Sequence, residues 1–549
     1  MRSTMMQVPL SLNHFLERAG TLFGDSQIVS RLPDKSLRRQ TYGDFYSRTR
    51  KLAAALRALG LKKGERVATL CWNHHAHLEC YFGIPAAGGV MHTLNLRLAP
   101  EEIGWIAHHA EDRFLVVDDV LLPLYRQFAN GHRFERVIVF PFSGKPVDKG
   151  FDDYEQLLNK SSSSDFRYEE HREDDPIAMC YTSGTTGKPK GVVYSHRSTV
   201  LHTLSAALAD NWGLSSRDVV LPVTPMFHAN SWGIPYGAVM VGAKVVFPGP
   251  HLHPEDLLDL FAAERPTLSF GVPTIWLAMI QAYEAQPGRW KLPPGLRTLV
   301  GGAAVPESLI RAYARHGVSI LQGWGMTETS PVATIAYIKP GFENQDEQFR
   351  LKATAGVPVP LVDLRIVGEG GEAAWDGKAV GEVQVHGPFI TGRYHGVEDP
   401  TLPLGRSPSL NFAADGWLRT GDVASVDAHG YVRITDRTKD LIKSGGEWIS
   451  SVDLENALMG HPAVAEAAVI AIAHEKWGER PLACVVLKPG KSAAPAELNA
   501  VLAKHFAKWQ LPDAYEFVAE IPRTSTGKFW KAKLRERYAT YRLPARASG

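Results

Sequence analysis

A run of glycines, hydroxyl side chains and lysines at residues 181–191 carries the strongest chemical signal in the chain. It reads Tyr-Thr-Ser-Gly-Thr-Thr-Gly-Lys-Pro-Lys-Gly. Its glycines let successive backbone N–H groups point into one concavity, and its hydroxyls and lysines add further donors. The run therefore predicts a phosphate cradle rather than a flexible surface loop. It is not a Walker A loop, because Thr182 stands where that motif needs glycine and Lys188 is followed by Pro189.

Two carboxylates further along the chain suit chemistry on a nucleotide. Glu328 follows Thr327 in a glycine-flanked segment, and Mg²⁺ prefers one or two carboxylates together with substrate oxygens. Asp422 follows Gly421, and a carboxylate in such a turn can accept hydrogen bonds from both hydroxyls of a ribose. The structural alternatives are a solvated surface glutamate and an Asx turn, and the residues alone leave the second alternative open.

Three basic side chains could complete such a site. Lys528 follows the polar segment 524–527, and a lysine on a loop can reach an anionic ligand, although loop lysines are usually solvated. Arg437 could reach a ribose or a phosphate, or lie on the surface. His228, in the run Pro225-Met-Phe-His, could contact a ligand or be a hydrogen-bonded core histidine.

Alternating strand and helix patterns surround these residues up to about residue 335. The leucine spacing of Thr41–Leu61 predicts a helix, and short apolar runs predict strands at Arg66–Cys71, Phe114–Val117 and Ile177–Tyr181. Such alternation favours a parallel α/β sheet. The last of these strands enters the glycine-rich run, after which a further strand and the helix Thr199–Ala209 are expected.

The pattern changes after residue 356. Short alternating strands such as Val362–Val367 and Gly381–Val385, separated by turns rich in Gly and Asp, predict a small barrel or sandwich. The residues beyond about 440 form a block of domain size. In it we expect helices at 452–459, 495–508 and 528–540, and strands at 464–473, 481–488 and 515–520.

Composition limits the class of protein. The 549 residues correspond to roughly three to four structural units. Lys plus Arg is 60 and Asp plus Glu is 58, so the net charge of +2 shows no basic excess typical of nucleic-acid binding. Four scattered cysteines without a CxxC pair argue against a disulfide framework or a zinc ribbon. Because we find no secretory signal and no run near the ~18 apolar residues of a membrane span, we expect a soluble cytoplasmic protein.

Two further patterns carry less weight. His74, His77 and Cys80 recur every three residues on a predicted helix, but no second ligand cluster supports a metal site, so we expect packing residues. The basic run Lys528–Arg537 could contact CoA phosphates or anionic lipid, or form a solvated helix face.

Taken together, the motifs resemble the adenylate-forming superfamily, which includes acyl-CoA synthetases, peptide-synthetase adenylation domains and beetle luciferases. The glycine-rich run resembles the phosphate loop of that family. The other segments that carry the resemblance follow in family order up to residue 528, namely Pro225-Met-Phe-His228, Gln322-Gly-Trp-Gly-Met-Thr-Glu-Thr329, Trp417-Leu-Arg-Thr-Gly-Asp422, Asp436-Arg-Thr-Lys439, Ser444-Gly-Gly-Glu447 and Arg523-Thr-Ser-Thr-Gly-Lys528. Each segment alone is weak, whereas the ordered set is specific.

The resemblance implies an α/β fold with two domains. Residues 1–436 are expected to form a large N-terminal AMP-binding and acyl-binding domain of two packed α/β sheets and a small β-barrel, the barrel at about 350–436. Residues 437–439 are the expected hinge, and residues 440–549 the expected small, mobile α+β C-terminal domain.

The resemblance also implies roles for individual residues. The expected catalytic residues are Lys528, His228, Thr185 and Glu328, of which Thr185 and Glu328 are also the expected metal ligands. The residues expected to bind ATP or AMP are Thr182, Ser183, Gly184, Thr185, Thr186, Gly187, Lys188, Lys190, Gly302, Ala303, Gln322, Gly323, Trp324, Gly325, Met326, Thr327, Asp422, Arg437 and Lys528. The expected acyl pocket comprises His228, Trp232, Gly271, Val272 and Pro273. The expected CoA path comprises Lys443, Ser444, Gly445, Gly446, Glu447 and Trp448, and Lys439 is the expected hinge residue.

The neighbours of His228 bear on the substrate. Peptide-synthetase domains commonly place an Asp just after this position to hold an α-amino group, whereas here the stretch is Ala229-Asn-Ser-Trp-Gly233. A bound amino acid would leave its ammonium group unpaired. Trp232 and Trp276 offer apolar walls, and Trp324 is bulkier than the small residues of some relatives. We therefore expect a fatty acid of medium to long chain and leave its length open.

The expected reaction has two halves. The carboxylate first attacks the α-phosphate of ATP, with Mg²⁺ as cofactor, and pyrophosphate leaves. The C-terminal domain then rotates about Lys439 and the acyl group passes to coenzyme A. The expected partners are therefore the fatty acid, ATP and CoA, with no nucleic acid; we also allow for a weak peripheral membrane contact and a homodimer.

Three alternatives stay open at this point. One is a CoA ligase for a short or aromatic acid, such as a methylthio-propionate- or cinnamate-like acid. Another is acyl transfer to a carrier protein. The third is an ATP-binding sensor without turnover, against which the intact Lys528 and Glu328 argue.

Overall fold

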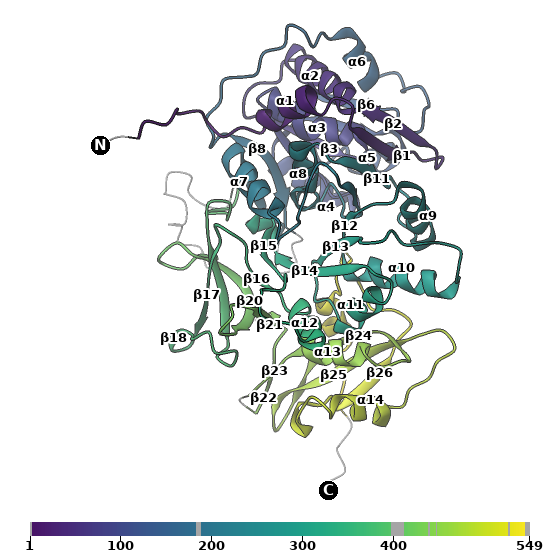
Figure 1. Ribbon diagram of the computed structural model, residues 1–549, viewed down its shortest axis with the longest axis vertical. Helices are drawn as coiled ribbons and strands as arrows, with labels where there is room; N and C mark the ends of the chain where they lie inside the picture. Colours follow the sequence, from purple (N-terminus) through teal and green to yellow (C-terminus); the bar gives the residue numbers. More distant parts are fainter. Residues whose placement is uncertain are drawn as a thin grey trace.

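The structure, a computed structural model, describes residues 3–182, 188–396, 411–437, 440–445, 447–524 and 527–543. These residues form four sheets (Figure 1). Three of the sheets precede residue 438 and build a large N-terminal domain, and the fourth builds a small C-terminal domain at one end of the molecule. Within the described ranges, no helix is both long and apolar enough to cross a membrane.

A seven-stranded sheet leads into the expected phosphate loop. Its order is β7-β6-β5-β3-β4-β8-β9, and only the β8–β9 pair is antiparallel. Its strands are β3 (Arg66–Leu70), β4 (Val90–Thr93), β5 (Asp112–Asp118), β6 (Arg136–Phe140), β7 (Asp152–Asp153), β8 (Pro176–Tyr181) and β9 (Gly191–Ser195). The helices of this part are α2 (Tyr42–Ala58), α3 (His75–Ala86), α4 (Pro100–His109), α5 (Leu122–Phe128), α6 (Tyr154–Lys160) and α7 (His196–Ala207).

The predicted elements of this region are confirmed with small shifts. The helix expected at 41–61 is α2, and the strands expected at 66–71, 114–117 and 177–181 are β3, β5 and β8. The helix expected at 199–209 begins at His196 instead, because Ser195 and Ser198 form a reciprocal capping box at its first turn.

A nine-stranded sheet supplies the floor of the candidate site. Its order is β16-β15-β14-β13-β12-β10-β11-β1-β2, parallel from β14 to β1 and antiparallel at both ends. Its strands are β1 (Gln27–Arg31), β2 (Leu37–Thr41), β10 (Val219–Pro222), β11 (Lys244–Phe247), β12 (Leu268–Gly271), β13 (Arg297–Gly301), β14 (Ser319–Gly325), β15 (Val332–Ile335) and β16 (Val357–Pro358). The helices of this part are α1 (Asn13–Leu22), α8 (Ile234–Val241), α9 (Pro254–Glu264), α10 (Pro273–Ala285), α11 (Glu307–Ala314) and α12 (Gln345–Lys352).

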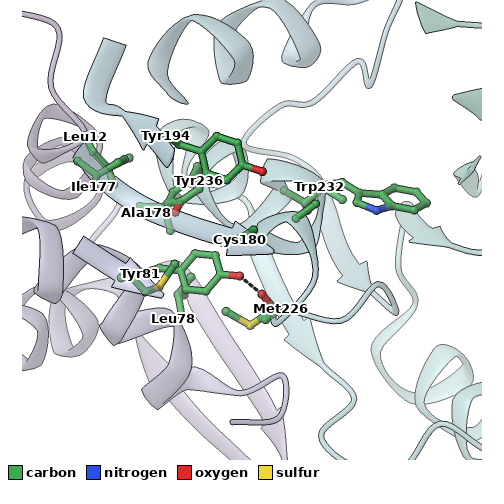
Figure 2. Close-up of a cluster of buried hydrophobic side chains, with 14 of the residues drawn as sticks. Leu12, Leu78, Tyr81, Ile177, Ala178, Cys180, Tyr194, Met226, Trp232 and Tyr236 are labelled. Atoms are coloured by element: carbon green, nitrogen blue, oxygen red, sulfur yellow. Dashed lines mark hydrogen bonds between the residues drawn. The ribbon is translucent and has the colours of Figure 1, made fainter. Parts of the chain in front are cut away.

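The two large sheets share one apolar core, which fixes β8. Ile177, Ala178 and Cys180 of β8 are buried together with Tyr81 of α3 and Tyr236 of α8 (Figure 2). The Tyr81 hydroxyl donates a hydrogen bond to the backbone carbonyl of Met226, which satisfies its polar end inside the core. The strand that enters the phosphate loop is therefore anchored on both sides.

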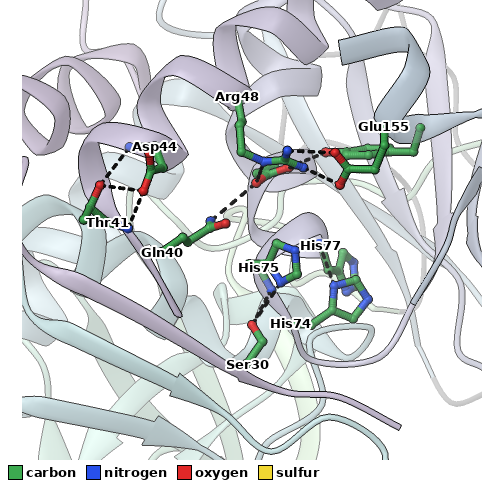
Figure 3. A network of polar contacts seen from close by, with 11 residues as sticks. Ser30, Gln40, Thr41, Asp44, Arg48, His74, His75, His77 and Glu155 are labelled. Atoms are coloured by element: carbon green, nitrogen blue, oxygen red, sulfur yellow. Dashed lines mark hydrogen bonds and ion pairs between the residues drawn. The ribbon is translucent and has the colours of Figure 1, made fainter. Parts of the chain in front are cut away.

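A buried ionic network joins α2, α3 and α6. Arg48 pairs with Glu79 and with Glu155, each over 2.7 Å, and Gln40 donates to Glu79 (Figure 3). The side chain of Glu79 is fully buried, and a buried carboxylate needs such a partner. These contacts give the polar side chains of the network a structural role. None of these residues lines the candidate site.

Packing and hydrogen bonds also explain the histidines near the start of α3. The Nε2 atom of His74 lies 2.8 Å from Asp118. The Nδ1 atom of His74 accepts from the backbone N–H of His77 (Figure 3). His77 bonds to Thr69 through Nε2, and Cys80 packs in the core. Both ring nitrogens of His74 are thus engaged.

The segment in which a small barrel was expected forms a five-stranded antiparallel sheet. Its order is β18-β17-β19-β20-β21. The strands are β17 (Asp363–Gly368), β18 (Gly371–Glu372), β19 (Gly381–His386), β20 (Leu418–Val426) and β21 (Val432–Arg437), so the strands expected at 362–367 and 381–385 are confirmed.

The C-terminal domain combines a sheet in the order β23-β22-β25-β24, with β26 beside β25, and three helices. Its elements are β22 (Ile442–Ser444), β23 (Glu447–Ile449), α13 (Ser451–Met459), β24 (Val464–His474), β25 (Gly478–Leu487), α14 (Pro495–Leu502), β26 (Ala514–Phe517) and α15 (Lys531–Arg537). The helix expected at 495–508 ends at Leu502. The helix expected at 528–540 begins only at Lys531, because the backbone N–H of Thr524 donates to the carbonyl of Lys528 and holds this segment as a turn.

Candidate active site

A cavity of about 560 Å³ opens where the N-terminal sheets, the antiparallel sheet and the C-terminal domain meet. The expected nucleotide, acyl and catalytic residues that line it are Thr182, Lys188, Lys190, His228, Trp232, Val272, Gly302, Gly323, Trp324, Gly325, Met326, Thr327, Glu328, Arg437 and Lys528. The carboxyl ends of β13 and β14 reach the cavity, which is where parallel α/β sheets commonly bind ligands.

Both ends of the glycine-rich run lie at this cavity. The backbone N–H of Thr182 donates to the carbonyl of Lys190 over 3.0 Å, and the N–H of Lys190 donates to the Thr182 hydroxyl over 3.1 Å. The Lys190 ammonium donates to Asn411 and lies 4.7 Å from the ring centre of Tyr394. The central residues Ser183, Gly184, Thr185, Thr186 and Gly187 lie outside the described residues.

Glu328 lies in a short turn after β14 and faces the cavity. It is only 7% exposed, so the solvated-surface alternative is wrong. The Tyr394 hydroxyl donates to its Oε1 atom over 2.8 Å, and its backbone carbonyl accepts from Thr391. A carboxylate held in this way at the cavity wall offers the hard oxygen ligand that suits Mg²⁺.

Asp422 and Arg437 face each other across neighbouring strands. The register of β20 and β21 pairs the two residues, and the Arg437 Nε atom lies 3.1 Å from the Asp422 carboxylate. The other carboxylate oxygen accepts from Trp324 Nε1 over 2.8 Å. Asp422 raises the pKa of the Arg437 guanidinium, which outweighs the effect of burial. Asp422 therefore lies just behind the cavity wall, with its carboxylate directed at two residues of the expected nucleotide site.

Lys528 reaches the cavity from the C-terminal domain. Its loop is closed by the bond from Gly527 N–H to the Thr524 carbonyl, and Gly527 has a φ of +86°, which favours glycine. Burial, followed by the nearby Arg437, lowers the pKa of Lys528 to about 8, although Asp422 and Glu328 act in the opposite direction. Because Lys528 lines the cavity and is only partly exposed, the solvated-loop alternative is wrong for this lysine.

His228 is a neutral imidazole beside Lys528. Burial lowers its pKa to about 3, and the charge of Lys528 adds to this effect. A left-handed turn follows: residues 229–232 all have φ between 42° and 59°. Such backbone is costly for residues other than glycine, and here Ser231 stabilises it by donating to Thr224 over 2.9 Å. The turn places the Trp232 side chain at the cavity wall.

The remaining wall is largely apolar. Val272, Leu299, Met326, Pro331 and Val332 line it together with Trp232 and Trp324. Among the described lining residues, the carboxylates are those of Glu328 and Glu382, and Glu382 is paired with Arg419. Next to His228 the wall carries Thr224, Pro225 and Ala229 but no acidic side chain among these residues.

Several expected residues lie outside the cavity lining. Ala303, Gly271 and Pro273 do not line it, and neither does Gln322, whose side-chain oxygen instead accepts from the Val305 N–H over 2.8 Å. The expected CoA-path residues Lys443, Ser444, Gly445, Glu447 and Trp448 belong to the β22–β23 hairpin and also lie away from the cavity. Gly446 and the expected hinge residue Lys439 lie outside the described residues.

The expected site residues do not include six polar residues of the lining. These are Tyr394, Asn411, Glu382, Arg419, Thr224 and Thr420. The first two contact expected site residues, because Tyr394 donates to Glu328 and Asn411 accepts from Lys190. Tyr394 and Asn411 belong to none of the motifs named above, and only the fold brings them to the site. Arg419 and Thr420 lie within the motif Trp417–Asp422, but no role was assigned to them.

The chain matches the model of the AMP-binding enzyme family over residues 16–395 and that of the AMP-binding enzyme C-terminal domain over residues 453–528. It therefore belongs to the AMP-binding enzyme family, as its motifs predicted. Among its relatives, a long-chain-fatty-acid–CoA ligase of Thermus thermophilus is 52% identical over 98% of this chain and 97% of its own length. A 3-methylmercaptopropionyl-CoA ligase of Ruegeria lacuscaerulensis is 41% identical over 98% and 99%.

Further comparisons agree in fold and extent. A medium-chain-fatty-acid–CoA ligase of Ectopseudomonas oleovorans is 39% identical over 100% of both chains. The structure of the ATP-bound protein MatB of Rhodopseudomonas palustris is 26% identical, with a TM-score of 0.81, over 97% of this chain and 99% of that one. The predicted fold class, with a large N-terminal and a small C-terminal domain, is thereby confirmed.

Proposed function

We propose that this protein is an ATP-dependent fatty acid–CoA ligase that acts on a medium- to long-chain carboxylic acid. One observation carries the proposal: Lys528 and Glu328 face a common cavity whose remaining wall includes the apolar side chains of Trp232, Val272, Leu299, Pro331 and Val332. This arrangement joins the charges needed to activate a carboxylate with ATP to a surface suited to an apolar tail. The full-length similarity to fatty-acid–CoA ligases supports the choice of substrate class.

In the first half-reaction the carboxylate oxygen attacks the α-phosphorus of ATP and pyrophosphate leaves with the bonding electron pair. Negative charge grows on the α-phosphate, and the protonated Lys528 stabilises it. Because its pKa is lowered to about 3, His228 is neutral, and it orients the carboxylate without forming an ion pair with it. The backbone and lysines of the 182–190 run hold the phosphates, while Asp422 and Arg437 hold the ribose.

Magnesium is an expectation that the residues fit. The buried Glu328 carboxylate, fixed by the Tyr394 hydroxyl at the cavity wall, would hold the ion together with Thr185, which lies outside the described residues. The ion would neutralise charge on the phosphate oxygens. The protein's part is to hold the Glu328 carboxylate at the cavity wall through the Tyr394 hydroxyl.

In the second half-reaction the sulfur of CoA attacks the acyl carbon, and AMP leaves. The β22–β23 hairpin, with Lys443, Ser444, Glu447 and Trp448, lies away from the cavity in this structure. We propose that the C-terminal domain rotates about Lys439 between the halves, which withdraws Lys528 and brings this hairpin to the site.

A CoA ligase for a short acid is the second candidate. Trp324 and Trp232 both stand at the cavity wall and narrow the room for a long chain. The 41% identity to a 3-methylmercaptopropionyl-CoA ligase fits this reading as well. Acyl transfer to a carrier protein is the alternative for the second half-reaction.

A panel of acids decides between these candidates. Pyrophosphate release is measured with acetate, 3-methylthiopropionate, cinnamate, octanoate, dodecanoate, palmitate and an amino acid, each with and without CoA. We expect octanoate or a longer fatty acid to give the highest kcat/KM, and turnover to require CoA. A preference for a short or aromatic acid refutes the fatty-acid assignment, and turnover without CoA refutes the thiol acceptor.

The cytoplasmic location, the weak peripheral membrane contact and the homodimer stay predictions. Sedimentation of the purified protein, alone and with anionic vesicles, measures the last two directly. A monomer that does not bind vesicles would contradict both.

A further inference from the structure

A buried polar network joins the two domains next to the expected hinge. Asp436 lies in β21 of the N-terminal domain, and Ser451 begins α13 of the C-terminal domain. The Ser451 N–H donates to Asp436 Oδ2 over 2.9 Å, and the Ser451 hydroxyl donates to the same oxygen. Asp436 is 2% exposed and Ser451 is fully buried. The network therefore connects Asp436 and Ser451, which stand on the two sides of residues 437–439 in the chain.

A second pair of residues repeats the same connection. The Ser450 hydroxyl donates to the backbone carbonyl of Thr435, while its oxygen caps α13 by accepting from the N–H of Asp453. The first N–H groups of a helix have no acceptor within that helix. Asp436 supplies an acceptor for one of them from the other domain. Two successive residues of β21 thus hold the first turn of α13.

Lys531 closes the network from α15. Its ammonium group donates to the Ser451 hydroxyl oxygen over 2.5 Å and pairs with Glu455 over 2.7 Å. Burial acts to lower the pKa of Lys531, but the carboxylates of Glu455 and Asp436 outweigh burial and raise it, so the side chain keeps its charge. One cation beside two buried carboxylates makes their burial tolerable.

The position of Lys531 connects the network to the cavity. Lys531 follows Lys528 by three residues, and the segment between them is held by the bridge of Arg523 with Phe529 and by the bond from Trp530 N–H to the Pro522 carbonyl. The ammonium of Lys531 is fixed against α13, which is itself fixed to β21. The base of the loop that carries Lys528 is therefore tied to the N-terminal domain.

We propose that Asp436, Ser451 and Lys531 form a lock across the hinge, which holds the C-terminal domain in the orientation that places Lys528 in the cavity. The lock rests on the proposed function, because it matters only if the two half-reactions use different orientations. Its members are positioning residues that act through Lys528. A rotation that brings the β22–β23 hairpin to the cavity parts Ser451 from Asp436, since a hydrogen bond does not survive a separation of a few ångströms. Thioester formation therefore does not need the lock.

The test compares two variants that each lose one hydroxyl. Ser451→Ala removes the group that links Asp436 to Lys531. The control is Tyr515→Phe, because the Tyr515 hydroxyl donates to Asn499 over 2.8 Å within the C-terminal domain. We expect Ser451→Ala to slow acid-dependent ATP–pyrophosphate exchange about tenfold, which corresponds to about 1.4 kcal/mol. Thioester formation from preformed acyl-adenylate and CoA should stay within twofold of the wild type, and the control should change neither rate.

A second measurement does not depend on activity. Hydrogen exchange of the peptide 447–455 in the ligand-free protein reports the Ser451 amide, and Asp436→Asn should speed it while the remainder of the C-terminal domain stays protected. Equal loss in both half-reactions together with a lower Tm would show a merely structural role and overturn the lock. So would unchanged exchange in Asp436→Asn. A wild type that activates no acid refutes the proposed function instead, and the exchange measurement still decides the lock.

Discussion

Adenylate formation should lose rate at alkaline pH because Lys528 loses its proton. Burial, with Arg437 nearby, lowers the pKa of this lysine to about 8, even though Asp422 and Glu328 favour its charged form. Only the charged form can stabilise the negative charge that grows on the α-phosphate. The rate should therefore be nearly constant up to about pH 7, be halved at about pH 8 and fall further above that value.

The size of the fall follows from the titration. At pH 9, one unit above the pKa, about one lysine in eleven carries its proton, so kcat/KM should drop roughly tenfold. This ratio reports the free enzyme, to which the pKa of about 8 applies. His228, with a pKa of about 3, does not titrate in this window. The assay is ATP–pyrophosphate exchange without CoA, because a thiol titrates in the same range.

Two variants test whether the titration of Lys528, and not of another group, causes the fall of kcat/KM at alkaline pH. Lys528→Arg keeps a charge up to pH 10, since a guanidinium has a pKa above about 12, and its profile should stay flat at a reduced rate. Lys528→Ala should lose on the order of 10²–10³ in rate and also stay flat. A wild-type profile that is flat to pH 10, or an arginine variant that falls with the same midpoint as the wild type, refutes the reasoning.

Three further predictions concern the metal and the acyl chain. Glu328→Gln should lose activity that raised Mg²⁺ partly restores, because an amide oxygen is a poorer ligand; normal turnover with unchanged Mg²⁺ dependence would remove Glu328 from the site. Tyr394→Phe should weaken Mg²⁺-dependent ATP binding by roughly 10- to 100-fold in calorimetry, with Tyr515→Phe as the control, because the lost hydroxyl fixes Glu328. Each added methylene of the acid should raise kcat/KM roughly fourfold, from about 0.8 kcal/mol, until the pocket ends; an acetate optimum would contradict this.

The sequence predicted the elements whose signals are local. The strand β8 and the glycine-rich run follow from neighbouring residues, since apolar side chains and glycines act over a few positions. Glu328 and Lys528 were assigned from the order of motifs, and the structure brings both to one cavity, although they are 200 positions apart in the chain. The role of each stays a prediction until it is measured.

The remainder depended on contacts between distant segments. Nothing local in the sequence marks Tyr394 as the partner of Glu328, because the hydrogen bond joins the segment between β19 and β20 to the short turn after β14. The hydrogen bond from Trp324 to Asp422 likewise joins residues far apart in the sequence, since Trp324 belongs to β14 and Asp422 to β20. The start of α15 shifted for a similar reason, since the Lys528 carbonyl bonds back to Thr524 instead of continuing a helix.

The central claim is that one chain performs two half-reactions with different faces of its C-terminal domain. A single-turnover assay of each half on Lys528→Ala tests it most directly, with Gly446→Trp as the opposite case. We predict that Lys528→Ala forms acyl-adenylate on the order of 10²–10³ more slowly, yet converts preformed acyl-adenylate and CoA to thioester at a near-normal rate. Gly446→Trp should accumulate adenylate and fail to make thioester. Equal impairment of both halves in both variants would contradict the account and favour a single fixed site.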